Sequence, residues 1–259
     1  MNKGFWEEQA RKHGQGVAAV NFDPIQEELM TSLLEELVPD GRAVADVGCG
    51  NGRTLLDLVP NRRAGKFVGY DFASTMVDVA EERRKELKLD NVRFHTFDAT
   101  APALPDGARN AFDMVLGKRL LINIKGDAKR QALQNIYDML REGGTYLMIE
   151  CFIEPLERTN EARKVLGLDR IGVKDFNEYL TADFMMEVER KFTVERMADV
   201  ASLYYFVSRV FNAALSEGKP DYFAPINKIA AQLMQAGVQP ISGYAPEVAY
   251  VLKKKANPL

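Results

Sequence analysis

The chain has 259 residues, of which 46% are hydrophobic and 27% are charged. These values are ordinary for globular proteins, and the length is enough for one large α/β domain, so disorder and low complexity are not expected. The 34 Lys and Arg residues against 37 Asp and Glu residues give a formal charge of -3, and no long basic run is present. Because proteins that track phosphates need such a basic surface, the composition argues against nucleic acid as the main substrate.

The N-terminal segment and the cysteines indicate location and redox state. Residues 1–16 are charged and contain no apolar stretch typical of a signal peptide, and no later segment has the roughly 18 uncharged apolar residues of a membrane span. We therefore expect a cytoplasmic protein that does not enter a membrane. Two cysteines, Cys49 and Cys151, are too few for a disulfide framework, and His13 and His95 form no cluster at zinc-ligand spacing. We expect reduced thiols and no bound metal.

In chain order, the first predicted elements are helices. An amphipathic segment with a tryptophan spans residues 4–12, and Pro24 opens a helix that runs to about residue 37. From residue 42 to 151, short apolar runs alternate with amphipathic stretches, a pattern typical of a parallel sheet with crossover helices. The predicted strands are residues 43–47, 66–71, 92–97, 112–116 and 145–151. The predicted helices are residues 52–59, 74–87 and 128–141, the last ended by Gly143 and Gly144.

After residue 151 the pattern changes. Residues 152–190 are mixed and polar, residues 192–197 and 248–252 are predicted to form the sixth and seventh strands, and helical stretches near 202–215 and 225–233 lie between them. No linker rich in Gly, Ser or Pro separates this part from the rest, so the segments 152–190 and 198–246 are interpreted as cap insertions packed onto the sheet. The prediction is a seven-stranded, doubly wound α/β sheet in one continuous domain. It divides into an N-terminal lid and helix (1–41), a cofactor-binding core (42–151), and the remaining strands with helical cap insertions (152–259).

The most informative motif is a glycine-rich turn, residues 46–52 with the sequence DVGCGNG, between the first predicted strand and the following helix. Glycines at 48, 50 and 52 let the backbone turn sharply and approach a ligand closely, where a Cβ atom would collide. The spacing G-x-G-x-G differs from the dinucleotide fingerprint G-x-G-x-x-G, which disfavours a nicotinamide oxidoreductase. We therefore expect a nucleoside-like ligand over this turn.

Two acidic residues stand at the ends of the next two predicted strands. Asp71 ends the second strand, where a carboxylate can accept hydrogen bonds from both hydroxyls of a ribose. Its replacement by alanine should weaken ligand binding with little loss of folding stability. Asp98 closes the third strand, in the sequence Phe97-Asp98-Ala99. Three motifs in this order, each at the carboxyl end of a strand, are far more specific than any one of them.

Together these motifs resemble those of class I S-adenosylmethionine-dependent methyltransferases, over about residues 42–151 and the last strand. The resemblance implies the Rossmann-like fold of that class, with S-adenosyl-L-methionine as cofactor and S-adenosyl-L-homocysteine as product. It implies that Asp46 helps to receive the ammonium end of the cofactor, while Asp71 binds the ribose. Asp98 would take the adenine amino group. The cofactor-binding candidates are Asp46, Gly48, Gly50, Asn51, Gly52, Asp71, Phe72, Met76, Asp98, Ala99 and Gly117.

Each of these residues also has a purely structural interpretation. A GxGxG loop is often only a tight strand-to-helix turn, Asp71 could cap the following helix, and Asp98 could cap a turn. Asp46 could simply order the loop. The ordered spacing of the three motifs favours cofactor binding.

The fourth strand leads into Gly117, Lys118 and Arg119, and in the family this strand end faces the transferring methyl group. The Asn-Pro-Pro-Tyr type motif of nucleic-acid and protein-glutamine methyltransferases is not present there, which argues against those substrates. Lys118 or Arg119 could hold an anionic group of a substrate, or could be a solvated loop charge. Glu150, near the end of the fifth strand, is a further rim candidate, or else it orders a loop.

The cap insertions and the N-terminal segment supply the remaining candidates. Tyr204 and Tyr205 could orient an acceptor or relay its proton, although aromatic residues at helical spacing are more often core. Other residues that could line the pocket or cover it, or merely face water or dock as a staple, are Phe5, Trp6, Arg163, Arg170, Lys174 and Asn177. Neither histidine is an obvious general base. The catalytic candidates are Arg119, Glu150, Tyr204 and Tyr205.

The sequence therefore predicts an enzyme that methylates an oxygen or nitrogen of a small molecule, in a biosynthetic pathway. The alternative is a non-catalytic protein that keeps the S-adenosylmethionine-binding fold, because fold does not imply function. The acceptor, the catalytic base and the oligomeric state stay open, and a homodimer is compatible with the sequence.

Overall fold

A seven-stranded mixed sheet forms the centre of the molecule, with the strand order β3-β2-β1-β4-β5-β7-β6. The computed structural model describes residues 3–14, 23–61, 65–216, 220–238 and 240–256. The strands are β1 (Ala43–Val47), β2 (Lys66–Asp71), β3 (Val92–Thr96), β4 (Phe112–Lys118), β5 (Leu140–Cys151), β6 (Phe192–Asp199) and β7 (Glu247–Lys254). The predicted seven strands and α/β class are confirmed.

The pairing directions bring several strand ends to one edge of the sheet. Strands β1 to β5 are parallel, whereas β7 runs antiparallel to both β5 and β6. In the register, Asp46 of β1 lies opposite Leu116 of β4, and Cys151 at the end of β5 lies opposite Glu247 at the start of β7. The carboxyl ends of the parallel strands therefore meet the amino end of β7, at the edge where open α/β sheets bind ligands.

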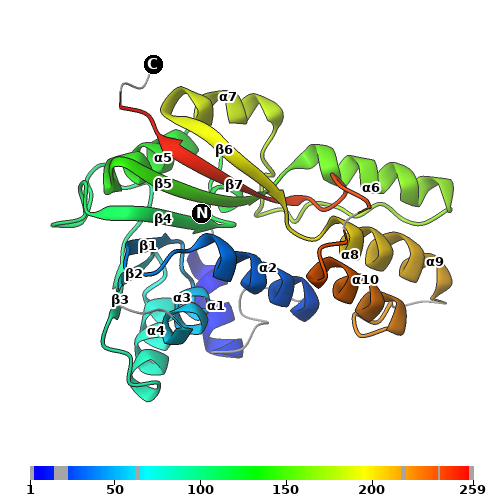
Figure 1. The fold of residues 1–259 in the computed structure, drawn as a ribbon, viewed down its shortest axis with the longest axis horizontal. Helices are drawn as coiled ribbons and strands as arrows, with labels where there is room; N and C mark the ends of the chain where they lie inside the picture. Colours follow the sequence, from blue (N-terminus) through cyan, green and yellow to red (C-terminus); the bar gives the residue numbers. More distant parts are fainter. Residues whose placement is uncertain (1–2, 15–22, 62–64, 217–219, 239, 257–259) are drawn as a thin grey trace.

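Helices cover both faces of this sheet, and each face has its own apolar core. One face packs against α2 (Pro24–Leu37), α3 (Arg53–Leu58), α4 (Ser74–Glu86), α8 (Ser202–Phe206) and α10 (Pro225–Gln235). The other packs against α5 (Ala128–Met139) and α7 (Ala182–Lys191), which lie above the sheet in Figure 1. Strands buried on both faces explain the nearly continuous apolar runs of β1 and β4.

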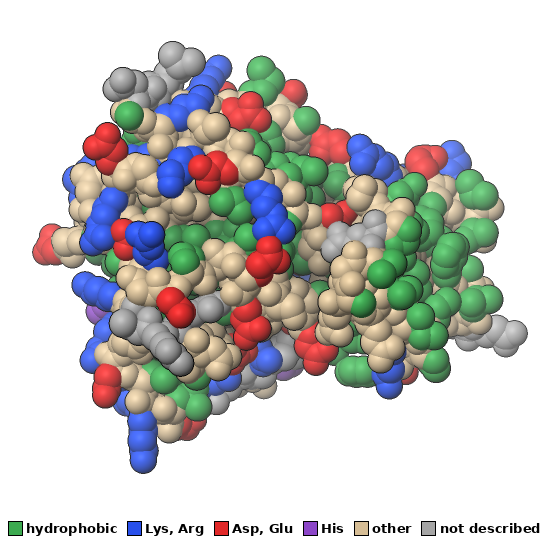
Figure 2. Space-filling view, viewed as in Figure 1, with side chains coloured by type: hydrophobic (Ala, Val, Ile, Leu, Met, Phe, Trp, Pro, Cys, Tyr) green, Lys and Arg blue, Asp and Glu red, His purple; other side chains and the backbone are tan. Residues whose placement is uncertain are grey.

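A cap of helices lies beyond the carboxyl ends of the central strands, on the right in Figure 1. It contains α6 (Ile153–Val165), α8, the π-helical turn η4 (Val207–Asn212), α9 (Ala213–Leu215) and α10. Hydrophobic side chains gather over this region in Figure 2. The exposed large apolar residues of the cap are Val165, Leu166, Phe211, Leu215, Phe223, Ile229, Leu233 and Val238.

One helix end differs from the prediction. Helix α5 ends at Met139, and Gly143 and Gly144 lie inside β5, so the expected end of the helix at these glycines is wrong. Gly143 has a φ of 63°, and the β4–β5 register shifts between Phe112 and Met114. A glycine in the left-handed region permits such an irregularity within a strand, and the same residue type is common after helices, so local sequence does not separate the two cases.

Two helices in the described part of the chain, α1 (Lys3–His13) and α2, precede the first strand of the sheet. Helix α1 packs against α4, and α2 begins at the predicted Pro24 after Asp23, whose carboxylate caps it. Within the described residues, none of the helices has the length and apolar character needed to cross a membrane.

Candidate active site

A cavity of about 360 Å³ lies over the carboxyl ends of the central strands. Its walls come from the ends of β1, β2, β4 and β5, the start of β7, helices α1 and α2, the segment 171–179, and the cap around Tyr205 and Arg209. The volume is in the range of small-molecule and cofactor sites.

The glycine-rich turn forms one wall of this cavity. Gly48, Gly50 and Gly52 have φ angles of 80°, 54° and 73°, a left-handed conformation that other residues adopt only with strain. Gly48 and Gly50 line the cavity, whereas Gly52 does not. A Cβ at Gly52 would lie 2.7 Å from Ala80 and from Phe94, so this glycine is needed for the packing of α3. The three glycines therefore have two different roles.

Asp46 at the end of β1 is buried but incompletely bonded. Its side chain is 2% exposed and lines the cavity, and its Oδ1 atom has no hydrogen-bond partner among the described residues. Burial raises the pKa of this carboxyl to about 7, Lys118 opposes the shift and Asp71 adds to it. A buried carboxylate oxygen without a partner is costly, and a cationic ligand group would stabilise it.

Asp71 at the end of β2 holds the turn together and faces the same cavity. Its Oδ2 accepts a hydrogen bond of 2.9 Å from the backbone N–H of Gly50, and its Oδ1 accepts one of 2.9 Å from Ala73. Burial raises the pKa of this carboxyl, while the N–H groups of Ala73 and Gly50 lower it. Each carboxylate oxygen has two lone pairs, so acceptor capacity remains for ribose hydroxyls. The sequence led us to expect little loss of folding stability on removal of Asp71, whereas these two buried contacts predict a larger loss.

Apolar side chains from distant segments cover this half of the cavity. Phe72 and Met76 follow Asp71 on the wall, and Trp6 of α1 packs against the small cluster of Ala10, Ala73 and Met76. Phe5 lies with its ring centroid 4.5 Å from that of Phe176, a residue of the loop between α6 and α7. Helix α1 and this loop therefore meet over the cavity.

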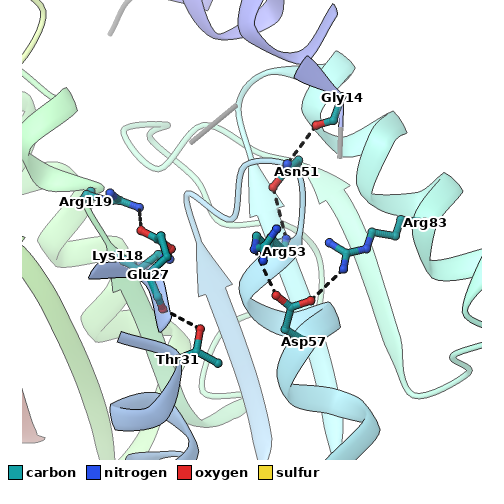
Figure 3. A network of polar contacts seen from close by, with 9 residues as sticks. All are labelled: Gly14, Glu27, Thr31, Asn51, Arg53, Asp57, Arg83, Lys118 and Arg119. Carbon is teal, nitrogen blue, oxygen red and sulfur yellow. Dashed lines mark hydrogen bonds and ion pairs between the residues drawn. The ribbon is translucent and has the colours of Figure 1, made fainter. Parts of the chain in front are cut away.

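A hydrogen bond links the cover to the glycine-rich turn (Figure 3). Asn51 is fully buried, and its Nδ2 donates to the carbonyl oxygen of Gly14, which follows α1. Its Oδ1 accepts from the backbone N–H of Arg53 at 3.4 Å. The predicted site residue Asn51 thus connects the turn to the N-terminal segment.

Besides Gly52, three cofactor candidates do not line the cavity: Asp98, Ala99 and Gly117. Asp98 is exposed, and its Oδ1 accepts hydrogen bonds from the N–H and hydroxyl of Thr100, which is the turn-capping role. Ala99 is buried, and its carbonyl accepts from Asn135. Gly117 is packed against Tyr146, since a Cβ there would lie 3.0 Å from the Tyr146 hydroxyl. Contacts of Asp98 and Ala99 with adenine stay a prediction.

The end of β4 carries a buried charge network (Figure 3). Glu27 of α2 accepts a hydrogen bond of 2.9 Å from Lys118 through Oε2 and one of 2.7 Å from Arg119 through Oε1. Both cations line the cavity. Arg119 has a φ of 54°, and its backbone N–H donates to Ile149. A substrate anion at these cations would have to compete with Glu27, a partner that sequence spacing does not reveal.

Glu150 does not lie on the rim as expected. It is fully buried, does not line the cavity, and accepts hydrogen bonds from the backbone N–H groups of Leu120, Leu121 and Ile122. Burial raises the pKa of this carboxyl to about 8 against the effect of these three groups. Glu150 therefore orders the turn after β4, the alternative that the sequence left open.

The two tyrosines of the cap have different positions. Tyr204 is fully buried outside the cavity wall, and its hydroxyl donates to Asp23 Oδ1 at 2.8 Å. Tyr205 lines the cavity, and the guanidinium of Arg209 lies 5.1 Å from its ring centroid and 4.9 Å from that of Tyr222. Arg209 also donates to Asp23 Oδ2 at 2.6 Å. Of the pair, only Tyr205 is in a position to touch a ligand without rearrangement.

Of the four residues expected from the first cap insertion, two line the cavity. Lys174 and Asn177 line the cavity, and Asn177 donates to the side chain of Asn123 at 2.9 Å. Arg163 instead bonds the carbonyl oxygens of Asp169 and Arg209, and Arg170 pairs with Glu157 at the surface.

Sequence reasoning missed several polar residues that line the cavity, among them Asp23, Gln26 and Glu247. Glu247 is 1% exposed, and its Oε2 accepts a hydrogen bond of 2.8 Å from Gln26 Nε2. Asp23 had a usable signal, because an aspartate directly before Pro24 is typical of a helix N-cap. Gln26 and Glu247 have no such signal, since only the tertiary fold joins them.

The doubly wound sheet, the glycine turn at its first strand and the acidic residue at its second define the class I S-adenosylmethionine-dependent methyltransferase fold. A family model described as a methyltransferase domain matches residues 39–197, which is more than half of the chain. The chain belongs to this methyltransferase domain family. A comparison with curated proteins finds no match.

Solved structures with the same fold differ in what they do. The N-methyltransferase NodS from Bradyrhizobium japonicum WM9, solved with S-adenosyl-L-homocysteine, is 11% identical, with a TM-score of 0.57 over 99% of this chain and 100% of that one. Geranyl diphosphate C-methyltransferase from Streptomyces coelicolor A3(2) is 14% identical, with a TM-score of 0.58 over 88% and 79%. The [4+2]-cyclase SpnF is 22% identical, with a TM-score of 0.56 over 87% and 80%. At these identities the likeness concerns the fold.

The residues of the cavity fit the cofactor of this fold class. Asp46 offers an unpartnered buried carboxylate oxygen to an ammonium group, and the turn at Gly48 and Gly50 presents backbone without side chains. Asp71 has acceptor capacity, and Phe72 and Met76 supply an apolar wall. Within the described ranges, no three His, Cys, Asp or Glu side chains are grouped so that they could hold a metal ion.

Proposed function

We propose that the protein transfers a methyl group from S-adenosylmethionine to an oxygen or nitrogen of a small molecule. The observation that carries the proposal is the unpartnered buried oxygen of Asp46, beside left-handed glycines and one strand from Asp71, on the wall of a single cavity. Asp46 offers an anion for the ammonium group of the cofactor, and the glycines leave open backbone beside it. Asp71 offers a second carboxylate, for the ribose.

Within this proposal, Asp46 receives the ammonium group of the cofactor and Asp71 accepts the hydrogen bonds of its ribose. Phe72 and Met76 contact the base, and α1 covers the site through Phe5 and Trp6. When bound, S-adenosylmethionine supplies a methyl group activated by a sulfonium sulfur. Holding the acceptor in line with this group can lower the barrier by about 7–11 kcal/mol.

Acceptor choice is assigned to the segments 152–190 and 198–246. Residues of both segments line the cavity, among them Lys174, Phe176, Tyr205 and Arg209. The cover formed by α1 and the 166–181 segment favours an acceptor small enough to be enclosed, rather than a polymer.

The test begins with calorimetric titration of ligand-free protein with S-adenosylmethionine, S-adenosylhomocysteine and NAD in parallel. Saturable binding of the first two, at about -8 kcal/mol or micromolar affinity, and no binding of NAD, is the expected result. Binding of NAD alone would overturn the proposal.

Turnover is tested next, with methyl-labelled cofactor and pools of small hydroxyl and amine compounds. Cofactor binding without transfer to any pool would favour the alternative, a non-catalytic protein that keeps the S-adenosylmethionine-binding fold. The [4+2]-cyclase SpnF has the same fold, in keeping with the rule that a fold does not determine a function.

A further inference from the structure

Two buried carboxylates on the cavity wall each have one oxygen without a hydrogen bond from any described residue, Oδ1 of Asp46 and Oε1 of Glu247. Asp46 is accounted for by the ammonium of the cofactor. Glu247 is not accounted for, and it belongs to a different part of the site. Buried polar atoms without a partner are rare in native proteins, so each one calls for a ligand or another physical reason.

The sheet order separates Glu247 from the cofactor side. Asp71 and Asp46 stand at the ends of β2 and β1, Arg119 follows β4, and Glu247 begins β7 opposite Cys151 of β5. Adjacent strands lie about 4.8 Å apart. Glu247 is therefore on the far side of β4 from both cofactor carboxylates, where an acceptor would lie.

The contacts of Glu247 fix its carboxylate and leave one position open. Gln26 Nε2 donates to Oε2 at 2.8 Å. The nearest cation is Arg119, whose Nε lies 3.6 Å from Oε1, too far for a hydrogen bond. Arg119 thus provides opposite charge to Glu247 but no donated hydrogen, and the missing partner is a hydrogen-bond donor.

The surroundings of Glu247 favour a neutral, aromatic donor. Lys118, Arg119, Lys174 and Arg209 line the cavity, and Glu27 and Asp23 pair with three of these four cations. With Glu247 counted as well, this group keeps one excess positive charge, which disfavours a protonated amine. The rings of Tyr179, Tyr205 and Tyr222 line the cavity and offer flat apolar surface. An aromatic hydroxyl meets both conditions.

We propose that Oε1 of Glu247 accepts a hydrogen bond from the phenolic hydroxyl of the methyl acceptor and takes its proton during transfer. This inference rests on the proposed function. As the acceptor oxygen bonds to the methyl carbon, the O–H proton passes to Glu247, and the bond between methyl and sulfur breaks with its electron pair left on sulfur. The products are an aryl methyl ether, the neutral thioether and a protonated Glu247, which releases its proton to solvent after product leaves.

The test uses 4-nitrophenol, whose anion absorbs visible light, with the full chain saturated with S-adenosylhomocysteine. The variant is Glu247→Gln, which keeps the size of the side chain and an oxygen for Gln26. The matched control is Glu195→Gln, an exposed carboxylate on β6. Thermal melting checks that all three proteins fold.

The wild type and the control should bind the neutral phenol, and the anion absorption should fall as protein is added. In Glu247→Gln, affinity should fall about tenfold, as expected for one charge-assisted hydrogen bond, and a larger fraction of bound probe should be anionic. When S-adenosylmethionine replaces S-adenosylhomocysteine, the kcat of Glu247→Gln for the formation of 4-nitroanisole should be lower than that of the wild type by about tenfold or more. Equal spectra and equal affinity for wild type and Glu247→Gln would overturn the inference, as would absence of any binding of 4-nitrophenol to the wild type.

Calorimetry with S-adenosylhomocysteine separates this inference from the proposed function. Glu247→Gln should bind the product with the affinity of the wild type, because Glu247 lies outside the cofactor half. If the wild type binds no cofactor, the proposed function fails. If it binds cofactor but the probe is indifferent to Glu247, only the assignment of Glu247 fails.

Discussion

Asn51 Nδ2 donates a hydrogen bond of 3.0 Å to the carbonyl oxygen of Gly14, and this contact joins the glycine-rich turn to the segment that follows α1. The donor is fully buried and comes from the turn that lines the cavity. Because α1 also covers the cavity through Phe5 and Trp6, the position of the cover is coupled to the conformation of the turn.

Replacing Asn51 with alanine should loosen this coupling. One hydrogen bond contributes about 0.5–1.5 kcal/mol, so affinity for S-adenosylhomocysteine should fall roughly two- to tenfold, chiefly through faster dissociation. Calorimetry and stopped-flow displacement measure the two effects. Asn61→Ala is the matched control, since its side chain bonds only Glu35 on the exposed surface among the contacts found. Equal dissociation rates for Asn51→Ala and wild type would show that the cover is not held by Asn51.

The raised pKa of Asp46, about 7, predicts pH-dependent cofactor binding. An ammonium group pairs with the carboxylate, so below pH 7 binding must first expel the proton, and affinity should be roughly tenfold weaker at about pH 6 than at about pH 8. Calorimetry in buffers of different ionisation enthalpy should detect proton release at the lower pH. The variant Asp46→Asn should bind weakly with no such dependence.

The same group predicts an opposite effect on folding. The folded pKa of Asp46 lies above the unfolded value of 3.8, so its neutral form stabilises the ligand-free protein at low pH, and this contribution is lost as pH rises through about 7. Without ligand at about pH 8, Asp46→Asn should therefore melt at a higher temperature than the wild type. A lower melting temperature would contradict burial as the cause of the shift.

Asp71→Ala should impair both binding and folding. Loss of charged hydrogen bonds worth about 1.5–3 kcal/mol each should weaken cofactor binding more than tenfold. Leaving the N–H groups of Gly50 and Ala73 without an acceptor should reduce the free energy of unfolding by about 1–3 kcal/mol. Urea unfolding and calorimetry on the folded variant measure these losses. Asp78→Ala, on the exposed face of α4, should change neither.

Gly52 and Gly107 form a matched pair for a stability test. Both have a φ of 73°, but a Cβ at Gly52 would lie 2.7 Å from Ala80, whereas nothing lies within 4 Å of one at Gly107. Gly107→Ala should lose only the conformational term of about 1–2 kcal/mol. Gly52→Ala should lose a further 1–3 kcal/mol, about the value for overpacking. Equal urea midpoints for the two variants would exclude the packing role of Gly52.

The sequence was sufficient for features that depend on local pattern. Strand ends at Asp46 and Asp71, and the glycines between them, follow from hydrophobic periodicity and turn chemistry within a short stretch of chain. All of Asp46, Gly48, Gly50, Asn51 and Asp71 lie on one cavity wall, as the motif predicts. Their binding of the cofactor stays a prediction.

Local sequence patterns do not predict features that depend on contacts between residues far apart in the chain. Glu150 is 30 residues from Leu120 in the chain, and only the pairing of β4 with β5 brings its carboxylate under the turn at Leu120. Glu247 lies 221 residues from Gln26, and it reaches the site only because the last strand pairs with β5. A carboxylate in an apolar strand pattern gives no sign of either role.

The position of β7 also determines the order in which the sheet can form. Strand β6 is bonded to the sheet only through β7, which comes later in the chain, so β6 cannot join its final place until β7 has paired with β5. The neighbouring pairs β1–β2 and β2–β3 are each separated by about 20 residues of chain, whereas the β5–β7 pair closes a loop that runs from residue 152 to residue 246. Refolding should therefore pass through a state in which β5 is an exposed edge, with its apolar surface open to other chains.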